Sequence, residues 1–165
     1  MGDDDEVLAV MQASTGRRIL GVGCLGLLGA VLIWIGLTRS FDALGWQLFL
    51  VVLGAAAVWM GDAMRRATAQ KIELTRAAVR SSDGEVIVGI SDIDTMDRGL
   101  FAFKPSNGFL IKAKTKAPTR WRPGLWWRMG RRIGLGGVTP GHQSKMMAEM
   151  IAALMADRAG GADQF

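Results

Sequence analysis

Two uncharged apolar runs constrain this chain more than any other feature. They span residues 19–37 and 43–61 and are separated only by the short insert 38–42. An α-helix rises about 1.5 Å per residue, so either run is long enough to cross a hydrocarbon core of about 30 Å. Two buried helices of a soluble domain are the alternative, but the rest of the chain is too short to surround them. The runs therefore predict a transmembrane helical hairpin.

Basic residues flank this hairpin on one side. Arg17 and Arg18 precede the first run, Arg65 and Arg66 follow the second, and the insert carries only Arg39. Because basic residues concentrate on the cytoplasmic side of a membrane, both termini are predicted to be cytoplasmic. The same four flanking arginines are predicted to anchor the hairpin to lipid headgroups.

Small residues recur on one face of each predicted helix. Gly29 and Gly36 share a face of the first helix, and Gly54 and Gly61 share a face of the second. Such faces allow two helix backbones to approach closely. Packing within the hairpin is the simpler interpretation, and a homo-oligomerisation face is the alternative.

The N-terminus is acidic where a secretory signal would be basic, so the first helix is expected to be retained. Glu6 stands where a myristoylation signal has serine or threonine, so that motif fails. The predicted organisation is a polar tail at 1–16, the hairpin with its juxtamembrane exit at 17–70, a cytoplasmic domain at 71–158 and a flexible tail at 159–165.

Short alternating apolar runs from residue 72 onward are typical of β-strands. Asp83-Gly84 and Asn107-Gly108 are each the pair that a tight primed turn requires, because both positions need a positive φ. A hairpin is predicted at each pair, the second joining strands at 100–103 and 109–113. A loop bracketed by Pro118 and Pro123 and a last strand at 131–138 are expected to follow.

A single amphipathic helix is predicted to end the domain. Thr139-Pro140 offers an N-cap and a first-turn proline, and the helix is expected to run to about Asp157 and to close at Gly160-Gly161. Its buried face is predicted from helical spacing and consists of Met147, Met150, Ile151 and Leu154.

Residues 72–156 resemble the bacterial pleckstrin-homology-like (PH-like) domains that follow a two-helix membrane hairpin. The resemblance rests on a first strand at 72–75, on 90–93 leading into the middle strands, on 101–104 with the Asn107-Gly108 turn, on 130–137, and on the closing helix. It implies a mainly-β, α+β domain, a small seven-stranded barrel capped by a C-terminal helix, in a bacterial inner-membrane protein. It brings no catalytic residues, and the Trp-rich insert at 121–127 departs from a simple meander.

The net charge of +5 is unevenly placed, because residues 99–148 contain no acidic side chain. Such a block seeks anionic partners. Arginine and tryptophan together suit a membrane interface, since guanidinium groups pair with phosphates and indoles lie at headgroup depth. Single-stranded nucleic acid is the rival partner, but a tether to the bilayer favours lipid. The predicted binding residues are Arg120, Trp121, Arg122, Trp126, Trp127, Arg128, Arg131 and Arg132; alternatively, these tryptophans belong to the core and the arginines to a solvated face.

The inventory of reactive side chains is short. His142 is the only histidine and Cys24 the only cysteine, which excludes zinc sites built from several histidines or cysteines; the place of His142 in the first helical turn favours a surface or capping role over catalysis. Asp92, Asp94 and Asp97 are the acidic cluster best suited to a divalent metal, but their spacing fails as a calcium loop and a solvated turn is the simpler interpretation. The glycine-rich stretch 130–141 lacks the ending of a phosphate-binding loop. No cofactor or metal is predicted.

These features predict a non-enzymatic integral inner-membrane protein. Its cytoplasmic PH-like domain is expected to bind anionic lipid or a membrane protein, as a scaffold or adaptor does. The alternative is an accessory or assembly subunit of a larger membrane complex. A metal-dependent enzyme that uses Asp92, Asp94 and Asp97 is the less favoured third interpretation.

Overall fold

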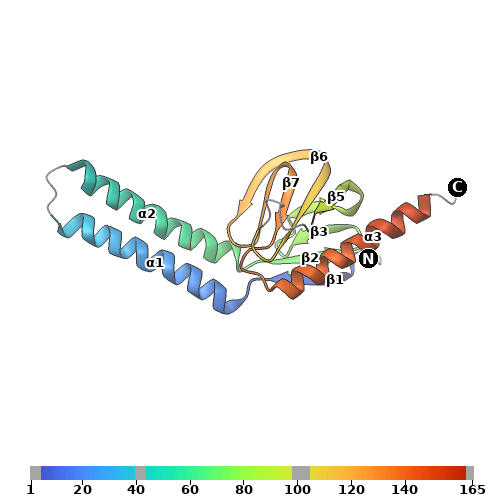
Figure 1. Cartoon of the computed structure of the whole chain (residues 1–165), viewed down its shortest axis with the longest axis horizontal. Helices are drawn as coiled ribbons and strands as arrows, with labels where there is room; N and C mark the ends of the chain where they lie inside the picture. Colours follow the sequence, from blue (N-terminus) through green and yellow to red (C-terminus); the bar gives the residue numbers. More distant parts are fainter. Residues whose placement is uncertain (1–4, 40–43, 98–104, 163–165) are drawn as a thin grey trace. The chain divides into compact units, whose positions relative to one another are not determined.

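The structure is a computed structural model that describes residues 5–39, 44–97 and 105–162, with side-chain surroundings to residue 158. The chain divides into two compact units. Residues 15–67 form a helical unit, and residues 1–14 together with 68–165 form a β-sheet unit (Figure 1). The β-sheet unit is therefore made from two separate stretches of sequence.

The helical unit consists of α1 (Thr15–Thr38) and α2 (Leu44–Ala67). Both helices are long and apolar enough to cross a membrane, as the two apolar runs predict. Their side chains are largely exposed: Leu37 is 71% exposed and Leu44 is 78% exposed. A contiguous apolar surface of this extent is unusual in a soluble monomer.

Four glycines hold α1 and α2 in close contact. A Cβ atom added to Gly29 would lie 2.7 Å from the carbonyl oxygen of Gly54, and one added to Gly54 would lie 2.8 Å from the carbonyl oxygen of Gly29. One added to Gly36 would lie 2.9 Å from the side chain of Val51. Gly61 also faces α1, and all four glycines are buried. These residues pack the hairpin internally.

Gly29→Ala should loosen this packing, whereas Gly23→Ala should not. The methyl group at position 29 would collide with α2 and should cost about 1–3 kcal/mol. At Gly23 an added Cβ has no neighbour within 4 Å, so the better helix propensity of alanine should stabilise by up to about 1 kcal/mol. Thermal unfolding in neutral detergent measures both, and equal melting temperatures for the two variants would contradict the packing.

The β-sheet unit contains two antiparallel sheets and a C-terminal helix (Figure 1). The four-stranded sheet has the order β1 (Val7–Gln12), β2 (Lys71–Thr75), β3 (Ala78–Ser81), β4 (Val86–Gly89). A short 3-10 turn, η2 (Ile90–Asp92), leads to the second sheet, which has the order β5 (Ile93–Asp97), β6 (Phe109–Arg122), β7 (Trp126–Leu135). The chain is thus a helical hairpin plus an α+β unit, and the described strands form two sheets rather than one closed ladder.

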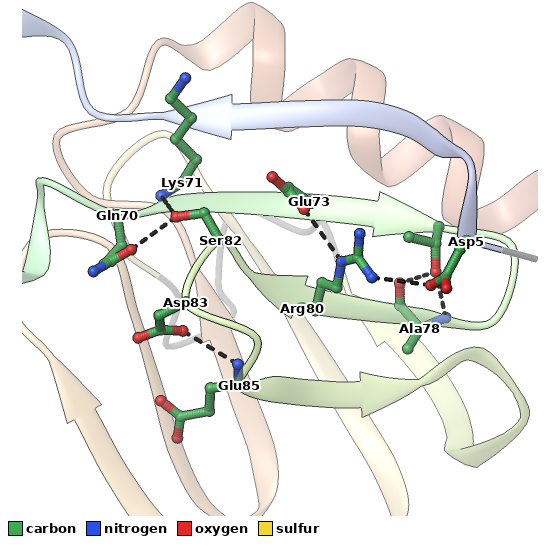
Figure 2. A network of polar contacts seen from close by, with 10 residues as sticks. Asp5, Gln70, Lys71, Glu73, Ala78, Arg80, Ser82, Asp83 and Glu85 are labelled. Carbon is green, nitrogen blue, oxygen red and sulfur yellow. Dashed lines mark hydrogen bonds and ion pairs between the residues drawn. The ribbon is translucent and has the colours of Figure 1, made fainter. Parts of the chain in front are cut away.

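The prediction of a polar tail over residues 1–16 is wrong, because Val7–Gln12 is a strand of the first sheet. Met11 pairs with Ile72 and Gln12 with Lys71, and Ala9 and Met11 are buried. Immediately before β1, the Asp5 carboxylate lies 3.0 Å from the Arg80 guanidinium of β3 (Figure 2). The predicted domain start at residue 71 is therefore also incomplete.

The two helices are consequently the connection between neighbouring antiparallel strands. Gln12 ends β1 and Lys71 begins β2, and the two residues are partners in the ladder. Only residues 13–14 separate β1 from α1, and only residues 68–70 separate α2 from β2. In topological terms, the helical hairpin is an insertion into a β-hairpin.

Helix α3 (Gly141–Ala162) completes the core of the β-sheet unit. Met147 and Ile151 are fully buried, and Met150 and Leu154 pack against the core, so the predicted apolar face is confirmed. The predicted end at Gly160-Gly161 is wrong, because the helix continues to Ala162. A glycine inside a helix costs only about 1 kcal/mol, which is too little by itself to end the helix.

One predicted hairpin is confirmed, and the other lies partly outside the described residues. β3 and β4 are antiparallel, but the predicted primed turn is wrong, because Gly84 has a positive φ of +89° and Asp83 does not have a positive φ. At the second site, the Gly108 N–H donates to the Pro105 carbonyl oxygen at 3.1 Å, and Asn107 has φ +52°. The predicted strand at 100–103 lies outside the described residues.

The strand assignment of β1 predicts opposite results for two neighbouring residues. Met11→Ala should lower the stability of the β-sheet unit by about 2–5 kcal/mol, because this side chain is fully buried. Val10→Ala should change it by less than about 0.5 kcal/mol, because Val10 points outward and is 37% exposed. Urea titration of the full chain in detergent, followed by circular dichroism, compares the free energies of unfolding of the two variants. If neither substitution changed the stability, residues 7–12 would be a solvated tail rather than a strand.

Candidate functional site

The predicted binding residues lie on the strands β6 and β7, which form one long hairpin, here called the ribbon (residues 109–135). The predicted loop between Pro118 and Pro123 is wrong, because β6 continues through Pro118 to Arg122. The ladder is irregular on both sides of the pair Ala117 and Gly130. Proline has no N–H to donate and is tolerated in a sheet at such irregularities. Gly130 has φ +61°, which a residue with a side chain rarely adopts.

The ribbon folds back at this irregular point, so its tip lies beside its base. The Gly136 N–H donates to the Leu125 carbonyl oxygen at 2.9 Å, and the Val138 N–H donates to the Gly124 carbonyl oxygen at 3.0 Å. Figure 1 shows β6 and β7 as a long, strongly curved pair. The fold-back turns one face of the ribbon tip toward the rest of the unit.

That inward face carries Arg120, Arg122, Trp126 and Arg128, which are cross-strand partners. Arg122 forms an ion pair with Glu85 at 2.9 Å, and Arg120 approaches the same carboxylate at 3.6 Å. Glu85 and Asp83 lie in the β3–β4 turn, where the Asp83 carboxylate accepts the Glu85 N–H at 3.2 Å (Figure 2). These arginines therefore fasten the ribbon tip to the first sheet.

Trp126 and Arg128 are drawn into the interior of the unit. Trp126 is only 2% exposed and belongs to the core. Arg128 is half-buried; burial lowers the pKa of its guanidinium, and the negative charges of Asp92 and Glu85 oppose that change. Arginine keeps its proton throughout the range in which proteins are folded, so Arg128 remains a cation. The interpretation of these tryptophans as core residues holds for Trp126.

The acidic residues Asp92 and Asp94 are engaged by β6 and β7 rather than by one another. Asp92 accepts hydrogen bonds from the Thr115 N–H at 3.1 Å and the Thr115 hydroxyl at 2.8 Å. Asp94 lies 3.1 Å from Lys112 and 3.5 Å from Arg131. Within the described ranges, no three histidine, cysteine or acidic side chains gather into a potential metal site.

The outward face of the ribbon combines apolar and basic side chains. Trp121 and Trp127 are cross-strand partners; Trp121 is 55% exposed and Met129 is 64% exposed. Lys116 and Arg132 are exposed and form no ion pair with any described residue. Three of the eight predicted binding residues therefore lie on this outward face, namely Trp121, Trp127 and Arg132. The single arginine among them, Arg132, forms no ion pair with any described residue.

A hollow of about 600 Å³ lies on the outward face of the second sheet. One wall is Trp127, whose indole lies so close to Gly134 that any side chain there would collide with it. The predicted binding residues include Trp127 and Arg132 but not Thr95, Leu110, Lys112 or Met129, although strand alternation alone places Leu110 and Lys112 on this face. The lining residues are Thr95, Asp97, Leu110, Lys112, Trp127, Met129 and Arg132.

The predicted headgroup anchors occupy one end of the helical unit. The Arg18 guanidinium donates to the Arg65 carbonyl oxygen at 3.3 Å, which brings the start of α1 to the end of α2. Arg65 and Arg66 each form an ion pair with Asp62, at 2.8 Å and 2.6 Å. Arg17 adjoins Arg18 at the same end.

Comparison with known proteins returned no match among family models, curated proteins or solved structures. The PH-like resemblance therefore stays a prediction that rests on the residues quoted for it.

The ion pair between Arg122 and Glu85 should appear as a coupling energy. A double-mutant cycle with Arg122→Ala and Glu85→Ala is expected to give about 0.5–1 kcal/mol, and less at high salt, because both groups are partly exposed. The control cycle pairs Glu85→Ala with Arg132→Ala, which has no ion pair with Glu85. Urea unfolding of the full chain measures each variant, and equal coupling in the two cycles would remove Arg122 from the fastening role.

Proposed function

We propose that this protein is a non-enzymatic module of the bacterial inner membrane whose β-sheet unit, a PH-like domain, binds the anionic cytoplasmic leaflet. The observation that carries the proposal is the outward face of the ribbon. Exposed Trp121, Met129 and Arg132 lie on that face, and neither Arg132 nor the exposed Lys116 of β6 forms an ion pair with any described residue. Indoles at headgroup depth and cations on phosphates are the contacts that interfacial proteins use.

The helical unit supports the membrane part of this proposal. α1 and α2 expose apolar side chains along their length, and Gly29, Gly36, Gly54 and Gly61 join the helices to each other. The arginines gather at one end, which by the positive-inside bias is the cytoplasmic end. Both termini of the chain are then cytoplasmic.

The strand pattern supports the PH-like assignment. The described strands form sheets of four and three, and α3 follows them and packs against the core, as the family implies. The first strand precedes the membrane hairpin instead of following it, so the resemblance over residues 72–156 omits β1.

The short connections favour lipid over other anionic partners. Two and three residues join the helices to β1 and β2, and three extended residues span only about 10 Å. The β-sheet unit is consequently tethered to the membrane, where the effective concentration of lipid is high. Nucleic acid offers the same charges but no such proximity.

The alternative of an accessory subunit is not favoured by the glycines, which pack α1 against α2.

Hydrogen exchange of the full chain in nanodiscs tests the proposal. Peptides from residues 114–132 should exchange several-fold more slowly in nanodiscs of phosphatidylglycerol than in nanodiscs of phosphatidylcholine. The double variant Lys116→Glu, Arg132→Glu should abolish the difference, because each basic residue near an anionic surface contributes about 1 kcal/mol. These substitutions spare the arginines that form internal ion pairs.

Lys71→Glu with Lys145→Glu is the control, because both lysines are exposed and lie outside the ribbon. This variant should keep the difference in exchange between the two lipids. Equal exchange in both lipids for the wild-type chain would remove the basis for leaflet binding.

A further inference from the structure

The hollow on the second sheet has a defined order of side chains. After an irregularity between Ile93 and Thr95, the outward side chains of β5 align with those of β6 and β7. The strand register produces two adjacent rows across the sheet. The first row contains Thr95, Lys112 and Arg132, and the second row contains Asp97, Leu110 and Gly134.

One row is polar and cationic, and the other contributes an apolar floor. Leu110 is half-buried, and the Trp127 indole covers Gly134 beside it. Met129 extends this apolar surface and is 64% exposed. The hollow of about 600 Å³ falls within the range of small-molecule sites.

The charges around the hollow select the ligand. Arg132 forms no ion pair with any described residue, and Lys112 shares its only described carboxylate, Asp94, with Arg131. Two adjacent cations of this kind suit a phosphate. Thr95 also lines the hollow, and its hydroxyl group can donate and accept hydrogen bonds with hydroxyls of a ligand.

We propose that this hollow binds one anionic glycerophospholipid with a hydroxylated headgroup. The phosphate lies between Lys112 and Arg132, a headgroup hydroxyl faces Thr95, and the glycerol end with its first acyl carbons lies against Leu110 and Trp127. The inference rests on the proposed function, because a unit tethered to the membrane has the lipid leaflet, rather than soluble phosphate, as the source of its ligand. It goes beyond that function by assigning a single stoichiometric site.

Native mass spectrometry of the full chain in neutral detergent tests the site. Dihexanoyl phosphatidylglycerol should form one saturable adduct, and dihexanoyl phosphatidylcholine and glycerol 3-phosphate should bind at least tenfold more weakly. Arg132→Gln should weaken the phosphatidylglycerol adduct about tenfold, because it removes a charge-assisted contact. Lys145→Gln on α3 removes the same charge outside the hollow and should leave the adduct unchanged.

Gly134→Ala provides a variant that changes no charge. Its methyl group must displace Trp127 from its present position, so it should also weaken the adduct. Unfolding curves of each variant separate a lost ligand from a lost fold. Equal binding of phosphatidylcholine, equal binding of glycerol 3-phosphate, or unchanged binding by both folded variants would each overturn the assignment.

The two proposals fail separately. Lipid-dependent exchange protection of residues 114–132 that persists without a specific adduct would leave leaflet binding intact and remove the pocket. Loss of that protection together with loss of the adduct would remove both.

Discussion

The pairing of β1 with β2 is the constraint on which the rest of the structure depends. These strands are separated by the whole helical unit in sequence, yet Met11 lies opposite Ile72 and both are fully buried. Forming this pair requires α1 and α2 to return the chain to its starting point, and the glycines between the helices allow that return at short range. The helical hairpin and the β-sheet unit are therefore joined by two short strand connections rather than by one linker.

A second constraint shapes the ribbon. Gly130 pairs with Ala117 where the ladder is irregular, and Pro118 directly follows that pair. The strands fold back at this point, and the Gly136 N–H donates to the Leu125 carbonyl oxygen. Because of this fold-back, alternate side chains of the ribbon tip lie on faces with different surroundings. Arg120 and Arg122 lie on one face and approach the carboxylates of the β3–β4 turn, whereas Trp121 lies on the other face and points outward. A basic sequence segment thus yields a structural arginine cluster and a separate outward face.

Local patterns were sufficient for the helices, for the presence of the β3–β4 hairpin but not its turn type, and for the buried face of α3, because apolar periodicity and turn residues act over a few positions. They failed for β1, whose short alternation follows an acidic run and has its partner beyond the helical unit. They also could not show that Arg122 is ion-paired whereas Arg132 is not, because the carboxylate that pairs with Arg122 lies 37 positions earlier in the chain. Trp127 is one of the predicted binding residues, but its position against Gly134 depends on the fold-back, which local patterns do not show.

We propose that the outward face of the ribbon contacts the anionic leaflet. A nitroxide label at Trp121→Cys, in a Cys24→Ala background, measures that contact directly by its access to oxygen in the bilayer and to a nickel chelate in water. Lys145→Cys on α3 is the matched position. In phosphatidylglycerol nanodiscs, the label at position 121 should favour oxygen and the label at 145 the chelate. Equal chelate access at both positions would contradict the account.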